Sequence, residues 1–464
     1  MIKQIDVPSH LLRRGFLGLL ATQFFGAMND NVLKGVLTFM VIQGGVWAGD
    51  LGEGGQGIVG LCFTIPFIFL SGYGGQIADR YSKRTVTMWL KCIEIPIVIA
   101  AGIGFLMGEL WITLAALFAL TCQSAFFGPA KYGMIPELVE DADLSRANGT
   151  INMMTNVAVI LGTLVAGMVS DAYFPAGSEG MLWLPAAVLL SIAVAGLGVA
   201  MLLTPLPVGD RHVRFDFNPL TTYLTTMREM SKTRLLMVMM AWGYFYLLAG
   251  IALFIVPEYT QVLEISSTEA SVLMGVLGVS IGLGCAAAGL ISGHRIEPRL
   301  VPIGAAGLVV FFALLAIVPP SLPDARPMLR VALSNVAMFI FGAGFFAGFY
   351  IVPLQSLLQY LSPEGERGRF LGTANAVSFI FLTIAALLYW AIRPAFADQP
   401  QHIFLVSSLL MGAGAAFFLW QLRGTGILVG SGAEIAAGPV GSDSSVAPDP
   451  NVSSDSSVSS EPNA

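Results

Sequence analysis

The first long apolar run of the chain, residues 15–43, carries two amides, an acid and a base near its middle: Asn29, Asp30, Asn31 and Lys34. At a rise of about 1.5 Å per residue, Asp30 would lie roughly 20 Å from either end of a helix, close to the midplane of a bilayer. A charge at that depth costs at least about 2.5 kcal/mol and normally faces a bundle interior or a wet cavity. Lys34 follows at i+4 on the same helical face and is the nearest candidate counter-ion of Asp30. The spacing predicts a site for substrate or for a coupling ion on one face of this helix.

A structural interpretation is the alternative for these charges. In it, Asp30 and Lys34 neutralise each other and hold their helix against a neighbour. Asn29 and Asn31 add hydrogen-bonding capacity that such a contact does not need, which favours the functional interpretation.

Polar side chains also lie at two other places in apolar runs. Asn152 and Asn156 follow one face of residues 148–171, where they either line a cavity or hold helices together. Lys131 and Tyr132 stand at the end of another run. Their types suit phosphate binding, and a lysine that extends to the membrane surface is the equal alternative.

One charged pair and one group of glycines complete the polar and small residues of interest. Lys91 and Glu94 lie on one face of residues 85–107 and predict a buried pair, a weaker coupling candidate than Asp30. The glycines of residues 269–293 predict close helix packing. They are Gly275, Gly278, Gly282 and Gly289.

Composition excludes a water-soluble globular protein. The chain is 55% hydrophobic and only 11% charged, with a mean hydropathy of +0.77, whereas soluble domains carry about 25% charged residues. The four cysteines lie in apolar runs without paired spacing, which predicts neither a disulfide framework nor a metal site. No nucleotide-binding loop or nucleophile constellation is present, so we expect no cofactor, no catalytic residue and no nucleic-acid partner. The sequence predicts an all-α integral membrane protein that is not an enzyme.

Hydropathy predicts twelve membrane-spanning helices. They are residues 15–43, 56–78, 85–107, 111–133, 148–171, 181–203, 235–257, 269–293, 300–318, 329–355, 370–392 and 402–422. The longest internal polar segment separates the first six from the last six. The predicted organisation is therefore an N-terminal six-helix bundle (1–204), a cytoplasmic linker (205–234), a C-terminal six-helix bundle (235–422) and a disordered cytoplasmic tail (423–464).

Basic residues are unevenly distributed between the two sets of loops. The odd-numbered loops hold only Arg326, Arg330 and Arg393, and nearly all other Lys and Arg residues lie in the termini and the even-numbered loops. The positive-inside rule therefore predicts that both termini are cytoplasmic.

The two predicted bundles repeat each other. A segment containing Gly74, Asp79 and Arg80 follows the second span, and Gly289, His294 and Arg295 follow the eighth with the same spacing. Matching sequence segments six spans apart indicate parallel repeats related by an axis along the membrane normal.

The loop between the second and third spans has the pattern Gly-x-x-Ala-Asp-Arg-x-x-x-Arg, with Gly75, Ala78, Asp79, Arg80 and Arg84. It resembles the signature loop of the major facilitator superfamily, and the resemblance covers residues 15–422. Within that superfamily the chain resembles the lysophospholipid transporter family in three segments. These are residues 29–31, residues 127–133 (FGPAKYG) and residues 146–149 (RANG).

The resemblance implies a cytoplasmic gate that holds the two bundles together while the outside is open. Its members are Gly75, Asp79, Arg80, Arg84, Arg146, Asn148, His294, Arg295 and Arg299. A topology anchor is the alternative for the bases, although anchoring needs no acid such as Asp79. His294 stands where the first half has Asp79, so a titrating histidine could make closure sensitive to pH.

The function implied by the resemblance is movement of lysophospholipids from the outer to the inner leaflet of the cytoplasmic membrane for reacylation. The mechanism would be rocking of two bundles around a midplane site. The chain has no His-x-x-x-x-Asp element, so acyl transfer would need a separate acyltransferase. Two alternatives are a proton-coupled exporter of drugs or other small amphiphiles, and a membrane scaffold for an acyltransferase that transports nothing.

Overall fold

The computed structural model describes residues 13–42, 45–139, 144–174, 179–206, 218–292, 297–362 and 367–423 of the 464-residue chain. In these ranges every regular element is a helix. The predicted C-terminal tail lies outside the described residues from position 424 onward. An all-α membrane architecture, as the apolar runs predict, is confirmed.

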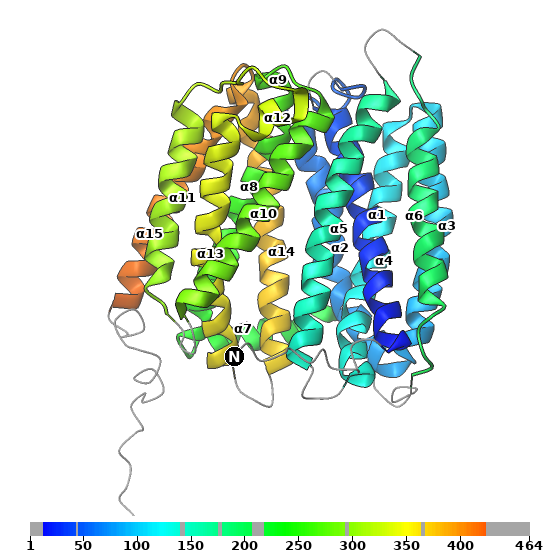
Figure 1. Ribbon diagram of the computed structural model, residues 1–464. Helices are drawn as coiled ribbons and strands as arrows, with labels where there is room; N and C mark the ends of the chain where they lie inside the picture. Colours follow the sequence, from blue (N-terminus) through cyan, green and yellow to red (C-terminus); the bar gives the residue numbers. More distant parts are fainter. Residues whose placement is uncertain are drawn as a thin grey trace, which may run out of the picture.

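Long helices in two groups make up the bundle (Figure 1). The N-terminal group is α1 (Arg14–Val41), α2 (Gly55–Arg80), α3 (Lys83–Met107), α4 (Leu110–Leu138), α5 (Leu144–Tyr173) and α6 (Leu184–Ala200). The C-terminal group is α8 (Leu235–Ile255), α10 (Ser267–Ser292), α11 (Leu300–Ile317), α13 (Asn335–Leu361), α14 (Arg367–Ile392) and α15 (Ile403–Arg423). Within the described chain, ten helices are long and apolar enough to cross a membrane, and α1 and the shorter α6 run alongside them.

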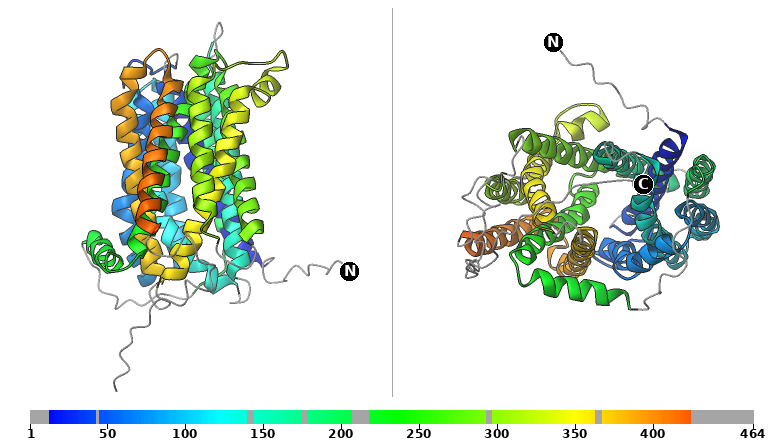
Figure 2. Two further views of the ribbon diagram at one scale, coloured as in Figure 1. Left: turned by 90° about the vertical axis from the view of Figure 1, so that its left-hand side faces the viewer. Right: turned by 90° about the horizontal axis from the view of Figure 1, so that it is seen from below.

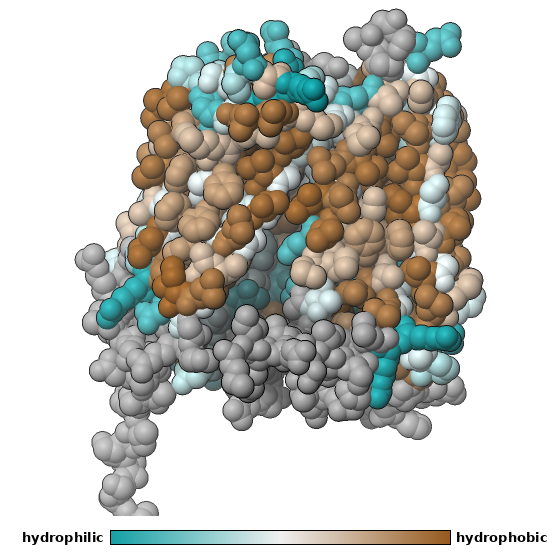
Figure 3. Space-filling model, viewed as in Figure 1, coloured by the Kyte–Doolittle hydropathy of each residue, from teal (hydrophilic) through white to brown (hydrophobic). Residues whose placement is uncertain are grey.

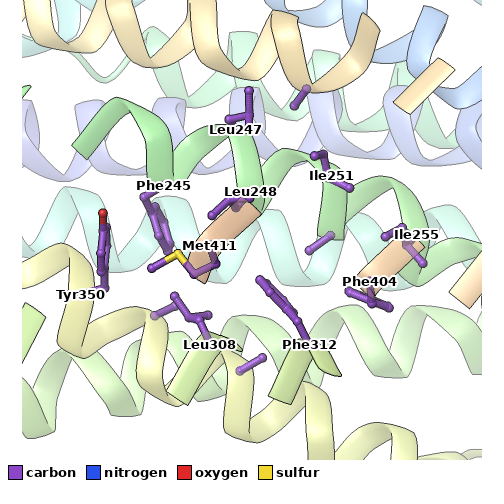
Figure 4. Close-up of a cluster of buried hydrophobic side chains, with 14 of the residues drawn as sticks. Phe245, Leu247, Leu248, Ile251, Ile255, Leu308, Phe312, Tyr350, Phe404 and Met411 are labelled. Atoms are coloured by element: carbon purple, nitrogen blue, oxygen red, sulfur yellow. The ribbon is translucent and has the colours of Figure 1, made fainter. Parts of the chain in front are cut away.

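Each group has its own apolar core. In the C-terminal group, α8 is surrounded by α13, α14 and α15, and Phe245, Leu248, Phe312, Phe404 and Met411 pack together (Figure 4). Separate clusters of buried side chains lie among α1 to α6. Seen along the bundle axis, the two groups lie side by side around a central region (Figure 2).

Two seams join the groups, α2 against α14 and α5 against α10. We call the end of the bundle where α1 begins and α15 ends the terminal side, and the opposite end the far side (Figure 1). In the α2–α14 seam, Phe67 stacks on Phe379 with centroids 4.6 Å apart, and the Thr383 hydroxyl donates to Thr64 at 2.8 Å. In the other seam, Gly278 allows Ile160 to approach closely.

Two elements differ from the sequence prediction. The segment predicted as one helix at 329–355 is divided into α12 (Pro327–Ala332) and α13, which begins later at Asn335. Ser334 causes the break, because its side chain caps α13 by accepting a hydrogen bond from the Ala337 backbone N–H. The predicted linker contains a helix, α7 (Pro219–Met230), and Pro219 is tolerated there because it occupies the first turn.

Short elements complete the far side. They are the 3₁₀ turn η3 (Val256–Glu258), α9 (Tyr259–Val262), η5 (Arg393–Phe396) and η6 (Pro400–His402). On the terminal side, α7 contacts α2 and α14 and lies at the periphery of the bundle (Figure 2).

Candidate functional site

Asp30 lies on α1 and is bonded to α4. Its Oδ2 accepts a hydrogen bond from the Ser124 hydroxyl at 2.7 Å. The Lys34 ammonium lies over the Phe63 ring of α2, 4.6 Å from its centroid. Among the described residues Asp30 and Lys34 form no direct ion pair, so the expected counter-ion is not in contact with the acid. The two charges instead connect α1 to two different helices.

Asn29 belongs to a buried polar cluster between α1 and α3. Its amide donates to Glu94 Oε1 at 2.7 Å, and Glu94 Oε2 lies 2.6 Å from Lys91 Nζ. The Lys91 and Glu94 side chains are only 1% and 2% exposed, so the predicted buried pair is confirmed. Room for the ammonium comes from Gly26 and Gly196, since a Cβ on Gly26 would lie 2.8 Å from Lys91 Nζ.

The other predicted amides lie apart from this cluster. The Asn31 amide donates to the Ala27 carbonyl of its own helix at 2.8 Å. Asn152 and Asn156 are exposed on α5. A contact that the sequence did not single out joins α1 to α5, where the Gln23 amide donates to the Thr155 hydroxyl at 3.0 Å.

Lys131 lies near the terminal-side end of α4. Only 8% of the residue is exposed, and its ammonium lies 4.3 Å from the centroid of the Tyr132 ring, which is half exposed. Among the described residues no carboxylate forms an ion pair with it. An unpaired buried ammonium is costly, so this position favours an anionic ligand.

The two groups of helices carry charge very unequally within their spans. The N-terminal group holds three bases and two acids there: Lys34, Lys91, Lys131, Asp30 and Glu94. In the C-terminal group, α8, α11 and α13 contain no charged residue, and those of α10, α14 and α15 lie at the helix ends. The charged residues within the spans therefore belong to the N-terminal group alone.

On the far side, α5 is bonded across a seam to α10. Both carboxylate oxygens of Asp171 accept hydrogen bonds from backbone N–H groups, those of Ser267 and Thr268, at 2.8 Å each. These N–H groups begin α10 and have no partner within the helix. Asp171 therefore caps a helix of the other group, and Gly167, one turn away, allows Ser271 to approach.

At the α2–α14 seam, the far side is closed by a buried ion pair. Arg393 and Glu258 belong to the C-terminal group and are 1% and 2% exposed. Gln56 of α2 donates to Glu258 and to the Tyr389 hydroxyl, and Glu53 Oε2 lies 2.6 Å from Arg393 Nη1. Sequence reasoning missed this cluster. The only signal was the presence of acids and a base at the ends of apolar runs.

A far-side vestibule of about 1200 Å³ lies between the two groups and is open to the exterior of the bundle. Glu53, Asp171, Glu264 and Asp398 contribute to its lining. Both bonded carboxylates, Glu53 and Asp171, therefore face this vestibule while holding the far side together.

Toward the terminal side the seams separate. A Cβ placed on Gly75 of α2, Gly282 or Gly289 of α10, or Gly372 of α14 would meet no described atom of another element within 4 Å. Figure 3 shows a hollow between the two groups on this side, with hydrophilic side chains inside it. The predicted close packing of the α10 glycines is therefore confirmed at Gly278 and is looser at Gly275. It is wrong for Gly282 and Gly289, where no described neighbour lies within 4 Å.

The structure describes only some of the predicted gate residues, and those it describes lie on this open side. Arg84 donates to the Leu203 carbonyl at 2.8 Å within its own group, Arg80 lies 5.9 Å from the Tyr81 ring, and Arg299 is exposed before α11. His294, Arg295 and the side chains of Asp79, Arg146 and Asn148 lie outside the described residues.

Comparison with known proteins identifies this architecture. The sequence model of the Major Facilitator Superfamily matches residues 19–386. The chain belongs to the major facilitator superfamily. Its two groups of helices, its multi-pass character and its central polar region agree with a membrane transporter of that superfamily.

Curated members of the superfamily resemble the chain over most of its length. The lysophospholipid transporter LplT of Cronobacter sakazakii is 28% identical over 382 residues, which cover 79% of this chain and 84% of that protein. The protein of the same name from Photorhabdus laumondii is 28% identical over 394 residues, 82% of this chain and 88% of the relative.

Solved structures of the superfamily share the fold. A POT family transporter in complex with 5-aminolevulinic acid superposes with a TM-score of 0.67 at 12% identity, over 90% of this chain and 97% of the other. A bacterial homologue of the human lysosomal transporter Spinster gives 0.61 at 12% identity, over 88% and 96%. The xylose transporter XylE from E. coli gives 0.59 at 16% identity, over 90% and 96%.

Proposed function

We propose that this protein is a secondary transporter that moves lysophospholipids across the cytoplasmic membrane, from the outer to the inner leaflet, by alternating access. The observation that carries the proposal is that the N-terminal group holds charged residues within its spans, among them Asp30 and Lys34 of α1 and Lys131 of α4, whereas α8 and α13 of the C-terminal group hold none. A lysophospholipid has a charged head group and a single acyl chain, so it needs both kinds of surface at once. The names of the two relatives described above support the same substrate.

In this proposal the head group binds to the N-terminal group. Lys131 takes the phosphate as a point charge, because its ammonium has no carboxylate partner among the described residues. Asp30 and Lys34 form the deeper part of the site, and Asn152 and Asn156 line the path on α5. Asn29 and Asn31 keep α1 in place, through Glu94 and through the backbone of α1 respectively.

The terminal side faces the cytoplasm in this proposal, as the distribution of basic loop residues supports. The arrangement described here is then the one open to the inside, with the far side closed by Asp171 and by Arg393 with Glu258. Gly75, Asp79, Arg80 and Arg84, with their counterparts in the second half, form the gate that closes the inside in the opposite state. Released lysophospholipid enters the inner leaflet, where a separate acyltransferase restores its second chain.

Uptake of labelled lysophosphatidylethanolamine into spheroplasts expressing the chain tests the proposal. We expect saturable uptake by the wild type and loss of uptake in Asp30→Asn at matched surface expression. Asp398→Asn is the control, because that carboxylate is exposed on the far side. Absence of uptake by well-expressed wild type would refute lysophospholipid transport and favour an exporter of other amphiphiles. Uptake that survives Asp30→Asn would refute only the role of Asp30 and would leave lysophospholipid transport standing.

A further inference from the structure

Arg393 and Glu258 form a bidentate ion pair that the proposed route through the N-terminal group does not use. Arg393 Nε lies 2.8 Å from Glu258 Oε1, and its Nη2 lies 3.0 Å from Oε2. Within the same group, the Gln261 amide also donates to Glu258 Oε2, at 2.7 Å. The pair is therefore oriented by its own group of helices, independently of the seam.

Two side chains from the other group complete the surroundings of the pair. Gln56 brings an amide N–H donor to the Glu258 carboxylate, and Glu53 brings a carboxylate to Arg393. Both come from one short segment at the start of α2. A cavity of about 100 Å³ adjoins them and is lined by Glu53, Gln56, Glu258 and Arg393. This segment thus presents a hydrogen-bond donor, Gln56, to the acid Glu258, and beside it an anion, Glu53, to the base Arg393.

A zwitterionic phosphodiester presents the same two groups. Its ammonium donates hydrogen bonds, as the Gln56 amide does. Its phosphate is an anion, as the Glu53 carboxylate is, and the forked guanidinium of Arg393 matches a phosphate better than the ammonium of a lysine would. In the proposed alternating-access cycle, opening of the far side would separate α2 from α14, so that Glu258 and Arg393 would keep each other but lose Gln56 and Glu53. A buried charge that loses hydrogen bonds gains strongly from a replacement ligand.

We propose that Glu258 and Arg393 form an outward-facing subsite for zwitterionic phosphodiester head groups, and that Gln56 and Glu53 occupy it in the state described here. The inference rests on the proposed function. Glu258 binds the ammonium and Arg393 binds the phosphate. Closure of the far side returns Gln56 and Glu53 to the pair and displaces the head group, which gives the subsite a built-in release step.

Uptake kinetics with two lipids test the subsite in the full-length protein in spheroplasts. Lysophosphatidylethanolamine carries both an ammonium and a phosphate, and lysophosphatidylglycerol carries only the phosphate. Glu258→Gln should raise the apparent KM for the first lipid by about tenfold or more, the size of a lost charged hydrogen bond, and change the second by less than about threefold. Arg393→Lys should raise both, because a lysine cannot replace the bidentate fork.

Gln56→Leu is a second variant that leaves the ion pair intact. It removes the side chain that competes with the ammonium, so the KM for lysophosphatidylethanolamine should fall relative to that for lysophosphatidylglycerol. Glu269→Gln is the matched control. Glu269 also forms a bidentate far-side pair, with Arg330 at 2.9 and 3.2 Å, but neither residue lines the cavity beside Glu258 and Arg393. In Glu269→Gln the ratio of the KM values for the two lipids should equal that of the wild type.

The outcomes separate this inference from the proposed function. Wild-type protein that takes up neither lipid refutes the proposed function. Wild-type uptake of both lipids, with an unchanged KM ratio in folded Glu258→Gln, overturns the subsite and leaves only a structural contact. If Glu258→Gln does not fold, Gln56→Leu decides, and an unchanged ratio there also overturns the subsite.

Discussion

Asp171→Asn should shift the protein away from the arrangement that is closed on the far side. The carboxylate accepts two backbone hydrogen bonds from the first turn of α10 across the seam. Asparagine keeps one acceptor oxygen and loses the charge that interacts with the N-terminal end of the helix dipole. A charged hydrogen bond contributes about 1.5–3 kcal/mol and a partly buried dipole contact up to about 2 kcal/mol. We therefore expect a loss of about 2 kcal/mol.

That loss changes the ratio of far-side-closed to far-side-open protein by about 30-fold, since 1.4 kcal/mol corresponds to tenfold. Cysteine alkylation measures it in a background in which Cys62, Cys92, Cys122 and Cys285 are replaced by serine. A reporter at Asn152, exposed on α5, should react more slowly. A reporter at Thr64, which is 1% exposed in the α2–α14 seam, should react faster.

The two reporters must move in opposite directions, because one side opens as the other closes. Unchanged rates at both, in protein that remains folded, would refute the role of Asp171 in closure. Rates that rise together would indicate local unfolding instead of a shift between states. Asp398→Asn, in a residue that lines the same vestibule, should leave both rates unchanged.

Three further predictions follow from the membrane-embedded residues. Glu94→Gln should lower the midpoint of thermal unfolding, because it leaves the Lys91 ammonium buried and unpaired at a cost of about 3–5 kcal/mol. The double variant Lys91→Met with Glu94→Leu should restore the midpoint, and equal midpoints for Glu94→Gln and the wild type would contradict this prediction. Gly282→Leu should fold normally, since its Cβ meets no described neighbour, but should abolish uptake by blocking closure of the terminal side; full uptake would show that this side does not close along α10. Lys131→Gln should weaken binding of lysophosphatidylglycerol, measured by titration in detergent, about tenfold or more, while a monoacylglycerol without phosphate should bind equally to both proteins.

Helix positions followed from the sequence because a membrane-spanning segment needs a continuous apolar run of fixed length. The main error, at 329–355, arose because α12 is largely apolar apart from Arg330 and runs directly into the apolar α13, and the break between them depends on one capping hydroxyl, that of Ser334. Hydropathy does not register a cap. The helix in the linker was missed for a related reason, since Pro219 indicates a break unless it is known to begin a helix.

The candidate site was predictable only within single helices. Lys91 and Glu94 are three residues apart, and local spacing brings them together as expected. Asp30 and Lys34 have suitable spacing too, but Ser124 and Phe63 on other helices are better placed partners. The partners of Glu258 lie in two regions far from it in the sequence, Gln56 in α2 and Tyr389 and Arg393 at the junction of α14 and η5. Such contacts depend on how the two groups of helices meet, and no local pattern encodes that.

The unequal charge of the two groups also bears on how the protein enters the membrane during synthesis. A charged residue at the centre of a helix raises its insertion free energy by about 2.5–3.5 kcal/mol, and α1 and α3 each carry an acid and a base there. The bond between Asn29 of α1 and Glu94 of α3 lets the two helices stabilise each other once both have emerged. Helices α8, α11 and α13 have no such requirement and can insert one at a time. Assembly of the first half is therefore the step at which cooperation between helices matters most.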